Sequence, residues 1–262
     1  MKSVKTLAAI ALSASAGLLA VPASAAIITY DTTGSYAYGA GVTSNNFNPS
    51  SGSITMTATA YSTTTDTTGA LRGACLNGFG TSGFGIAAIE DGGSLTSDCT
   101  ASSPFHAIDN TGTVDGVLLI FSARVQLIGI SSGWVGNNGG TSDGDFSVLR
   151  GNLLANPAAG AAGTYVNGLA LNAMTGWTLL GSTNTDAIAG DELINQSVNA
   201  NNQLSRYWYV SANSSLFNSG LMMNDFFKVK TVTVSTYVPE PATLGLLGLG
   251  LAGIGFVRRR RK

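Results

Sequence analysis

A two-residue alternation of apolar and polar side chains is the feature that most constrains the fold of this chain. It is clearest from Ser53 to Tyr61. From Ile54 onward, threonine and finally tyrosine occupy every second position, and the positions between them are Ile54, Met56, Ala58 and Ala60. This period places one face of an antiparallel strand against a core. No apolar stripe persists at helical spacing with capping residues, so we expect strands to dominate.

Two further segments make specific predictions. The run from Gly116 to Ala123 is continuously apolar at its centre, which predicts a strand covered on both faces. In Phe226 to Thr236 the apolar parity changes between Val229 and Val232, which predicts a β-bulge near Thr231. The other expected strands are Val125 to Ser131, Asp145 to Arg150, Trp177 to Leu180 and Arg206 to Ala212. Many short strands joined by Gly, Asn and Ser loops predict an all-β fold, an antiparallel β-sandwich of the jelly-roll type.

The N-terminus has the pattern of a secretory signal peptide. Lys2 and Lys5 precede an uncharged run from Thr6 to Val21. Ala23 and Ala25 then supply the A-x-A pattern that signal peptidase accepts. We therefore expect signal peptidase to cleave after Ala25.

The C-terminal segment from Val238 to Lys262 also has the composition of a membrane-targeted sequence. No charge occurs from Ala242 to Val257, and five basic residues follow, which are Arg258, Arg259, Arg260, Arg261 and Lys262. The uncharged residues form a helix of about 24 Å, shorter than the roughly 30 Å hydrocarbon core, so we expect one short transmembrane helix. Basic residues beside a span stay cytoplasmic, which leaves the preceding chain outside.

Pro239, Glu240 and Pro241 stand immediately before this span. Two prolines disfavour helix, so the segment stays extended and accessible above the bilayer. The order of Pro-Glu-Pro, apolar span and basic cluster resembles the PEP-CTERM sorting signal. That resemblance implies an exosortase as partner, transient residence in the cytoplasmic membrane and cleavage near the Pro-Glu-Pro.

The body of the chain also resembles exosortase-dependent surface proteins. The segments that carry this resemblance are His106 to Asn110, Asp115 to Leu119, Ser132 to Trp134, Asp143 to Leu149, and Tyr207 with Trp208. It implies association with the cell surface or the extracellular matrix, and the sorting signal implies a Gram-negative bacterium.

These observations divide the chain into a signal peptide over residues 1–25, an extracellular β-sandwich domain over 26–237 and a sorting tail over 238–262. Without its two ends the domain keeps six Lys and Arg against thirteen Asp and Glu, a net charge near −7. An acidic surface repels phosphates, so we expect no nucleic-acid partner.

Only two cysteines occur, Cys75 and Cys99, and both lie in the exported part. An oxidising compartment favours a disulfide between them, and closing a loop of this length contributes roughly 3 kcal/mol in the chain-entropy model. A redox or metal-binding pair is the alternative, although no further Cys or His cluster accompanies them.

Calcium is the one metal for which the sequence offers ligands, although no cofactor is required by any motif. Asp143 and Asp145 supply hard oxygen ligands in a Gly-rich loop, with Asn137, Asn138 and Asp115 as further oxygen donors. The spacing is not that of an EF-hand loop, so calcium rests on ligand type alone.

Aromatic residues offer a site for stacking on sugar rings. Trp134, Tyr207 and Tyr209 are the candidates, because alternation places Trp208 on the opposite face from the two tyrosines. One set is expected in the core and the other outward.

Catalytic motifs are weak. A Ser-His-Asp triad can be written with His106 and Asp109, but no nucleophile motif surrounds a serine. The carboxylate pairs Glu90 with Asp91 and Asp191 with Glu192 could serve a glycosidase, although solvated loop charges explain them better. We therefore expect a non-catalytic protein that associates with the surface or with exopolysaccharide, with a carbohydrate-binding module as the first alternative and a glycoside hydrolase as the second.

Overall fold

The computed structural model describes residues 25–34, 44–63, 70–88, 106–136, 144–151, 165–170, 177–183, 197, 199–213 and 225–236. These ranges hold antiparallel strands and turns, and no helix in them is long and apolar enough to cross a membrane. The strands are β1 (Ile27–Asp31), β2 (Ser44–Phe47), β3 (Met56–Thr63), β4 (Ala70–Gly73), β5 (Cys75–Gly78), β6 (Phe84–Ala87), β7 (Ile108–Asp109), β8 (Asp115–Val135), β9 (Phe146–Gly151), β10 (Tyr165–Ala170), β11 (Trp177–Ser182), β12 (Ser205–Ala212) and β13 (Phe226–Thr236). The expected signal-peptide residues before Ala25 and the expected membrane helix lie outside these ranges.

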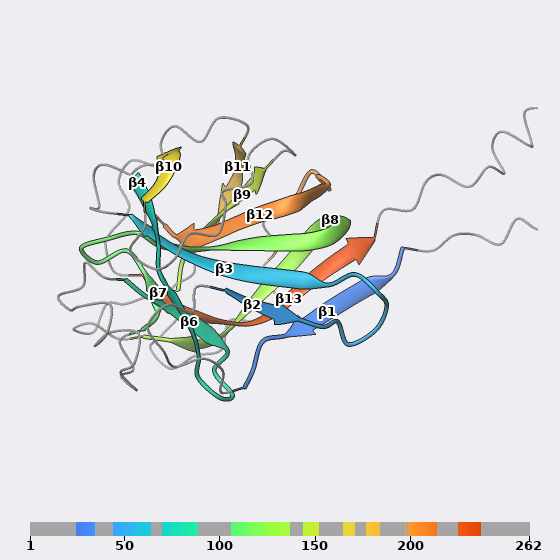
Figure 1. Ribbon diagram of the computed structural model, residues 1–262. Helices are drawn as coiled ribbons and strands as arrows, with labels where there is room; N and C mark the ends of the chain where they lie inside the picture. Colours follow the sequence, from blue (N-terminus) through green and yellow to red (C-terminus); the bar gives the residue numbers. More distant parts are fainter. Residues whose placement is uncertain are drawn as a thin grey trace, which may run out of the picture. The chain divides into compact units, whose positions relative to one another are not determined.

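The long strand β8 links two groups of strands within the unit Ala26–Thr236 (Figure 1). Its first part, up to Phe121, pairs with β3 and β12 in a layer with the order β10-β4-β3-β8-β12-β9-β11. Its last part, from Val125, pairs with β13, which also pairs with β1, β6 and β7. One continuous strand therefore belongs to both groups.

The bend between the two parts of β8 is marked by a shift in register. Ser205 of β12 lies opposite Val125, whereas Tyr207 lies opposite Ile120, so residues 121–124 of β8 correspond to Arg206 alone. At this point Ser122 donates its N–H to the Thr55 carbonyl, and the Thr55 N–H donates to Ser122 Oγ, both at 3.0 Å. These bonds continue the pairing of β8 with β3 one residue beyond Phe121 and Met56.

Both faces of the first layer are buried. One face contributes alternate residues, such as Leu119 and Trp208, to the main core shared with β13, β1 and β6. The other face contributes Leu118 and Tyr209 to a second apolar cluster with Tyr61. This arrangement confirms the prediction that the Gly116 to Ala123 run is covered on both sides.

The all-β, antiparallel prediction is confirmed, and several strand bounds agree closely with expectation. β13 spans Phe226–Thr236 as predicted, and its register against β8 shifts between Val229 and Thr231, which confirms the bulge. One prediction is wrong in detail: Val125 to Ser131 is not a separate strand but the second half of β8. The ladder continues through the bend because β12 and β13 pair with β8 on either side of it.

Cys75 lies fully buried in β5 and is disulfide-bonded, and the described residues include no free cysteine. Its expected partner, Cys99, lies outside the described ranges. The pairing of Cys75 with Cys99 therefore stays a prediction.

Trp208 anchors the main core, which predicts a large cost for its removal. The side chain is fully buried, and its Nε1 donates to the Ser205 carbonyl at 3.2 Å. We expect Trp208→Ala to lower the free energy of unfolding by about 3–5 kcal/mol, because it leaves a cavity and an unpaired carbonyl. Leu179→Ala, at a side chain that is 38% exposed, is the matched control and should change stability by less than about 1 kcal/mol. Equal losses in the two variants, measured by urea unfolding, would contradict the assignment of this core.

Candidate functional site

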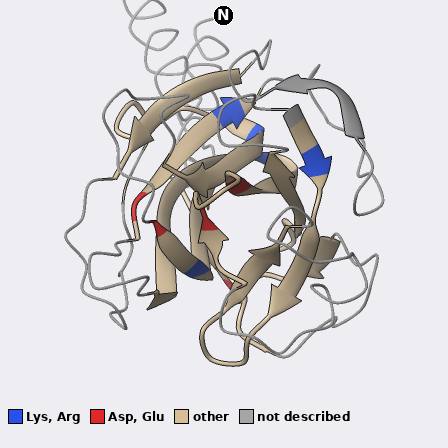
Figure 2. Ribbon diagram, turned by 90° about the vertical axis from the view of Figure 1, so that its left-hand side faces the viewer, with Lys and Arg blue, Asp and Glu red and all other residues tan. Residues whose placement is uncertain are grey.

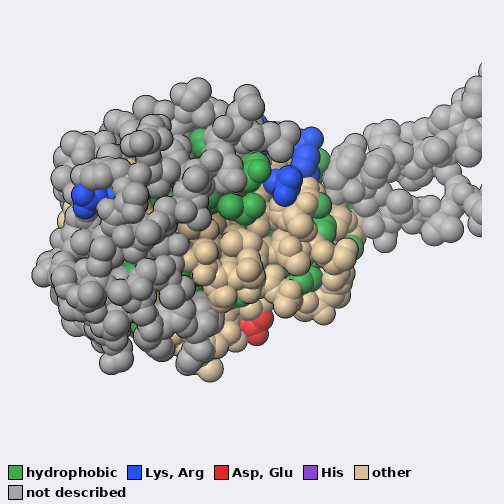
Figure 3. Space-filling view, viewed as in Figure 1, with side chains coloured by type: hydrophobic (Ala, Val, Ile, Leu, Met, Phe, Trp, Pro, Cys, Tyr) green, Lys and Arg blue, Asp and Glu red, His purple; other side chains and the backbone are tan. Residues whose placement is uncertain are grey.

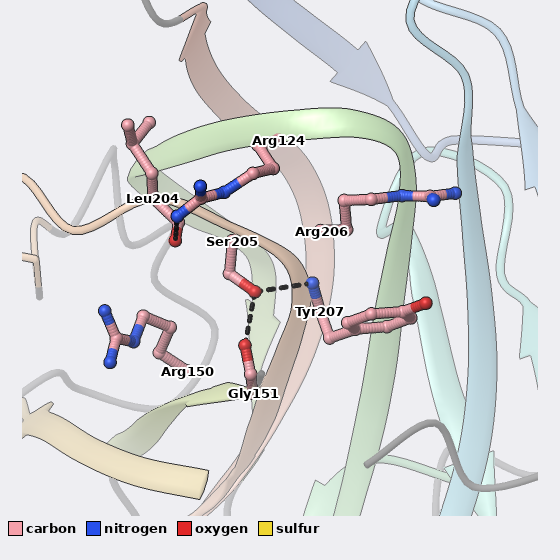
Figure 4. A pocket seen from close by; sticks show the side chains of 7 residues that line it. All are labelled: Arg124, Arg150, Gly151, Leu204, Ser205, Arg206 and Tyr207. Carbon is pink, nitrogen blue, oxygen red and sulfur yellow. Dashed lines mark hydrogen bonds between the residues drawn. The ribbon is translucent and has the colours of Figure 1, made fainter. Parts of the chain in front are cut away.

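A small pocket opens at the bend of β8 (Figure 4). Its volume is about 230 Å³. The lining residues come from the β8 bend, the end of β9 and the start of β12, and they are Arg124, Arg150, Gly151, Leu204, Ser205, Arg206 and Tyr207. We call this site the arginine pocket.

The strand pairing explains why three arginines that are distant in sequence come together. Arg124 lies at the bend, where the register shift leaves it exposed. Arg150 lies opposite Trp208, and Gly151 opposite Tyr207, in the β9–β12 pair. Ser205 connects the strands that line the pocket. Its Oγ donates to the Gly151 carbonyl and accepts from the Tyr207 N–H.

Each guanidinium is positioned by one hydrogen bond to the protein. Arg124 Nη2 donates to the Leu204 carbonyl at 3.3 Å, and Arg150 Nη1 donates to Gln203 Oε1 at 2.6 Å. Arg206 Nε donates to the Phe121 carbonyl at 2.9 Å, and its guanidinium lies 5.9 Å from the Tyr207 ring centre. A guanidinium carries five N–H donors, so each of the three retains donors for another partner. Among the described residues, no carboxylate forms an ion pair with any of these arginines.

The turn before β12 is braced against the pocket. Gln203 donates its N–H to Asn199 Oδ1, and Asn199 Nδ2 donates back to the Gln203 carbonyl, both at 2.9 Å. Asn202 adopts a φ of 53°, a left-handed conformation that Asn tolerates better than most residues, and accepts from Gln126 Nε2. The partners of Arg124 and Arg150 are therefore held in place by β8 and by the turn itself.

The pocket concentrates positive charge in an acidic domain. Arg124, Arg150 and Arg206 are half of the six basic residues in the domain, which carries thirteen Asp and Glu. In Figure 2 most of the basic segments lie toward the top of the view and the acidic segments lie below them. Figure 3 shows a group of basic side chains on the surface toward the end where β8 bends, next to apolar side chains. Among the residues that the structure describes, the positive charge at the pocket therefore favours an anion, although the net charge of the whole domain does not.

Another basic residue, Lys228 of β13, lies apart from the arginine pocket and between two aromatic rings. Its Nζ is 3.9 Å from the centre of the Phe79 ring and 4.4 Å from that of Trp134, its cross-strand neighbour. Phe79 in turn stacks on His106, with ring centres 6.2 Å apart. Lys228 is only 4% exposed, and burial lowers its pKa to about 8. Desolvation disfavours the charged form of Lys228, whereas the two cation–π contacts favour it.

The structure places the other sequence-predicted residues as follows. One face of β12 was expected to point outward, but both are buried: Tyr207 and Tyr209, at 8% and 1% exposed, lie in the second apolar cluster, and Trp208 lies in the main core. Neither ring presents a face for stacking on a sugar, whereas Trp134 is partly exposed beside Lys228.

The candidate metal-binding and catalytic side chains that the structure describes are buried. They are Asp145, Asp115, His106 and Asp109. The other predicted site residues lie outside the described ranges. They are Asp143, Ala23, Glu90, Asp91, Asp191, Glu192 and the residues of the sorting signal.

The described residues contain no group of three or more His, Cys, Asp or Glu side chains placed to hold a metal ion. Asp145 lies at the start of β9, and its expected loop partner Asp143 is outside the described ranges. Calcium binding therefore stays a prediction based on ligand type.

Comparison with known proteins supports the reading of the C-terminus. Residues 238–262 match the PEP-CTERM protein-sorting motif, which confirms the sorting signal that the sequence predicted. The motif indicates an exported protein that passes through a membrane and is processed by an exosortase.

No curated protein matches the sequence. Among solved structures, the C-terminal domain of a chitobiase from Bacteroides fragilis is similar, with 13% sequence identity and a TM-score of 0.24. That match covers 48% of this chain and 66% of the other, slightly less than two thirds. A TM-score this low carries no argument about fold or function.

The lowered pKa of Lys228 predicts a pH dependence of stability. Between about pH 8 and its usual pKa of 10.5, the unfolded chain binds more protons at this residue than the folded protein does. The free energy of unfolding should therefore rise with pH above about 8, and Lys228→Met should reduce that rise. Lys230→Met, two residues along the same strand, is the control and should keep it.

The measurement is urea unfolding at several pH values between 7.5 and 9.5. This window stays below the range in which Tyr30 and Tyr61, whose pKa values burial raises to about 12, would lower stability. An identical pH slope in the wild type and in Lys228→Met would contradict the buried position of Lys228.

Proposed function

We propose that the mature chain is an exported, non-catalytic protein that associates with the cell surface or with the exopolysaccharide matrix of a Gram-negative bacterium. The observation that carries this proposal is the sorting motif at residues 238–262. Its basic cluster and apolar span follow a domain that has the polar, acidic composition of an extracellular protein. Signal peptidase and an exosortase are its processing enzymes.

The route follows from the two ends of the chain. The signal peptide directs export and is removed after Ala25. The short helix from Ala242 to Val257 holds the chain in the cytoplasmic membrane, with Arg258 and its basic neighbours inside. Cleavage near Pro239 to Pro241 then frees the β-sandwich domain, a fold of the jelly-roll type, on the outer side.

Carbohydrate binding is the alternative that a specific feature favours. The arginine pocket has surplus N–H donors and lies on the surface of an all-β scaffold. Glycoside hydrolysis has less support, because its candidate carboxylates, including Glu90 and Glu192, are adjacent to other acids in loop-like sequence.

Mass spectrometry of the protein recovered from the culture supernatant and cell surface tests the processing route. We expect an N-terminus at Ala26 and a C-terminus near Pro239 to Pro241, without Arg258 to Lys262. Replacing Pro239, Glu240 and Pro241 together by alanine should leave the full tail in place and retain the protein in the membrane. An extracellular form that still carries the basic cluster would contradict the proposal.

A further inference from the structure

We propose that the arginine pocket binds one anionic group, a carboxylate or a sulfate ester, carried by a sugar residue of an extracellular polysaccharide. The choice of a polysaccharide rests on the function proposed above. The choice of an anion rests on the side chains of the pocket alone.

Two guanidinium groups form the centre of this site. Figure 4 shows Arg124 and Arg150 with their guanidinium groups on the same side of Ser205, whereas that of Arg206 points the other way. A planar guanidinium matches the two oxygens of a carboxylate or sulfate with parallel hydrogen bonds. Arg124 and Arg150 are thus the direct ligands that we infer, and Arg206 adds positive potential.

The site is organised before any ligand arrives. Arg150 is held by Gln203, Arg124 by the Leu204 carbonyl, and both partners belong to the braced turn that precedes β12. Because these side chains are already ordered, an anion loses less affinity to side-chain ordering when it binds. The remaining N–H donors of each guanidinium stay available for the anion.

The size of the pocket selects a small group over a long polyanion. A volume of about 230 Å³ is below the roughly 300–1,000 Å³ of a drug-sized site, which suits a single monosaccharide unit. Nucleic acids are bound by a series of phosphate contacts along a groove, and the domain around this pocket carries a net charge near −7. Leu204 supplies an apolar surface against which the CH groups of a sugar ring can pack.

The test is isothermal titration of the processed extracellular protein. The probes are oligogalacturonate, its methyl ester, a sulfated galactan oligosaccharide, inorganic sulfate and a single-stranded DNA oligonucleotide. The ester removes the charge and adds one methyl group to the carboxylate, so we expect it to bind at least tenfold more weakly than the free acid. The sulfated oligosaccharide distinguishes a sulfate ester from a carboxylate, and binding of the preferred probe should weaken as NaCl is raised.

Variants assign the binding to the pocket. We expect Arg124→Gln and Arg150→Gln each to weaken binding by about tenfold or more, since each removes a charge-assisted bidentate contact. Arg150→Lys keeps the charge but loses the planar fork, so its affinity should lie between those of the wild type and Arg150→Gln. Lys230→Gln removes one charge from β13 and is the control that should bind normally. Unchanged urea unfolding of each variant checks that it folds.

Several outcomes would overturn the inference, and they separate it from the proposed function. Saccharide binding that is unaffected in both glutamine variants overturns the site but leaves the proposed function standing. Binding of inorganic sulfate through Arg124 and Arg150, without binding of either acidic saccharide, would overturn the inferred saccharide ligand and leave the proposed function, which rests on the sorting motif, standing. Tighter binding of a DNA oligonucleotide than of either saccharide through the same arginines would also overturn it.

Discussion

The bend in β8 is the constraint on which the rest of the structure depends. A strand that pairs with β3 and β12 before the bend and with β13 after it commits both groups of strands to one hydrogen-bonded network. The bend removes residues 121–124 from the β12 ladder, and the Phe121 carbonyl accepts a hydrogen bond from the Arg206 side chain of β12. The same irregularity exposes Arg124 beside the ends of β9 and β12. The core and the arginine pocket are therefore two consequences of one feature.

Charge is distributed in a way that the whole-chain total conceals. Five basic residues lie in the sorting tail and two in the signal peptide, so processing leaves an acidic domain whose remaining cations have specific surroundings. Three of them meet at the pocket, and Lys228 is enclosed by Phe79 and Trp134. An acidic protein with a local positive site such as the arginine pocket can discriminate against extended polyanions and still hold a single anionic group.

Much of the fold could be predicted from the sequence, because alternation in Ser53 to Tyr61 and the parity change before Val232 are local signals of strand and bulge. Short strands such as β5 (Cys75–Gly78) and β6 (Phe84–Ala87) could not be predicted. Each has only four residues, one of them glycine, and shows no alternation of apolar and polar side chains. The sequence predicted that only one face of the strand with Tyr207 and Trp208 would be buried, and both are, because burial on both faces depends on distant segments. The arginine pocket gave no sequence signal, because Arg124, Arg150 and Arg206 are brought together by a register shift between strands that are far apart in the chain. The sorting motif was predictable, since its three parts are contiguous.

The most direct test of the link between the bend and anion binding is a crystal structure of the processed protein grown with selenate, a sulfate analogue that selenium anomalous scattering locates. An anomalous peak between the guanidinium groups of Arg124 and Arg150, absent from crystals of Arg150→Gln, is the result we predict. Selenate bound only at other positions, with the pocket arginines unchanged and without an anion, would contradict it.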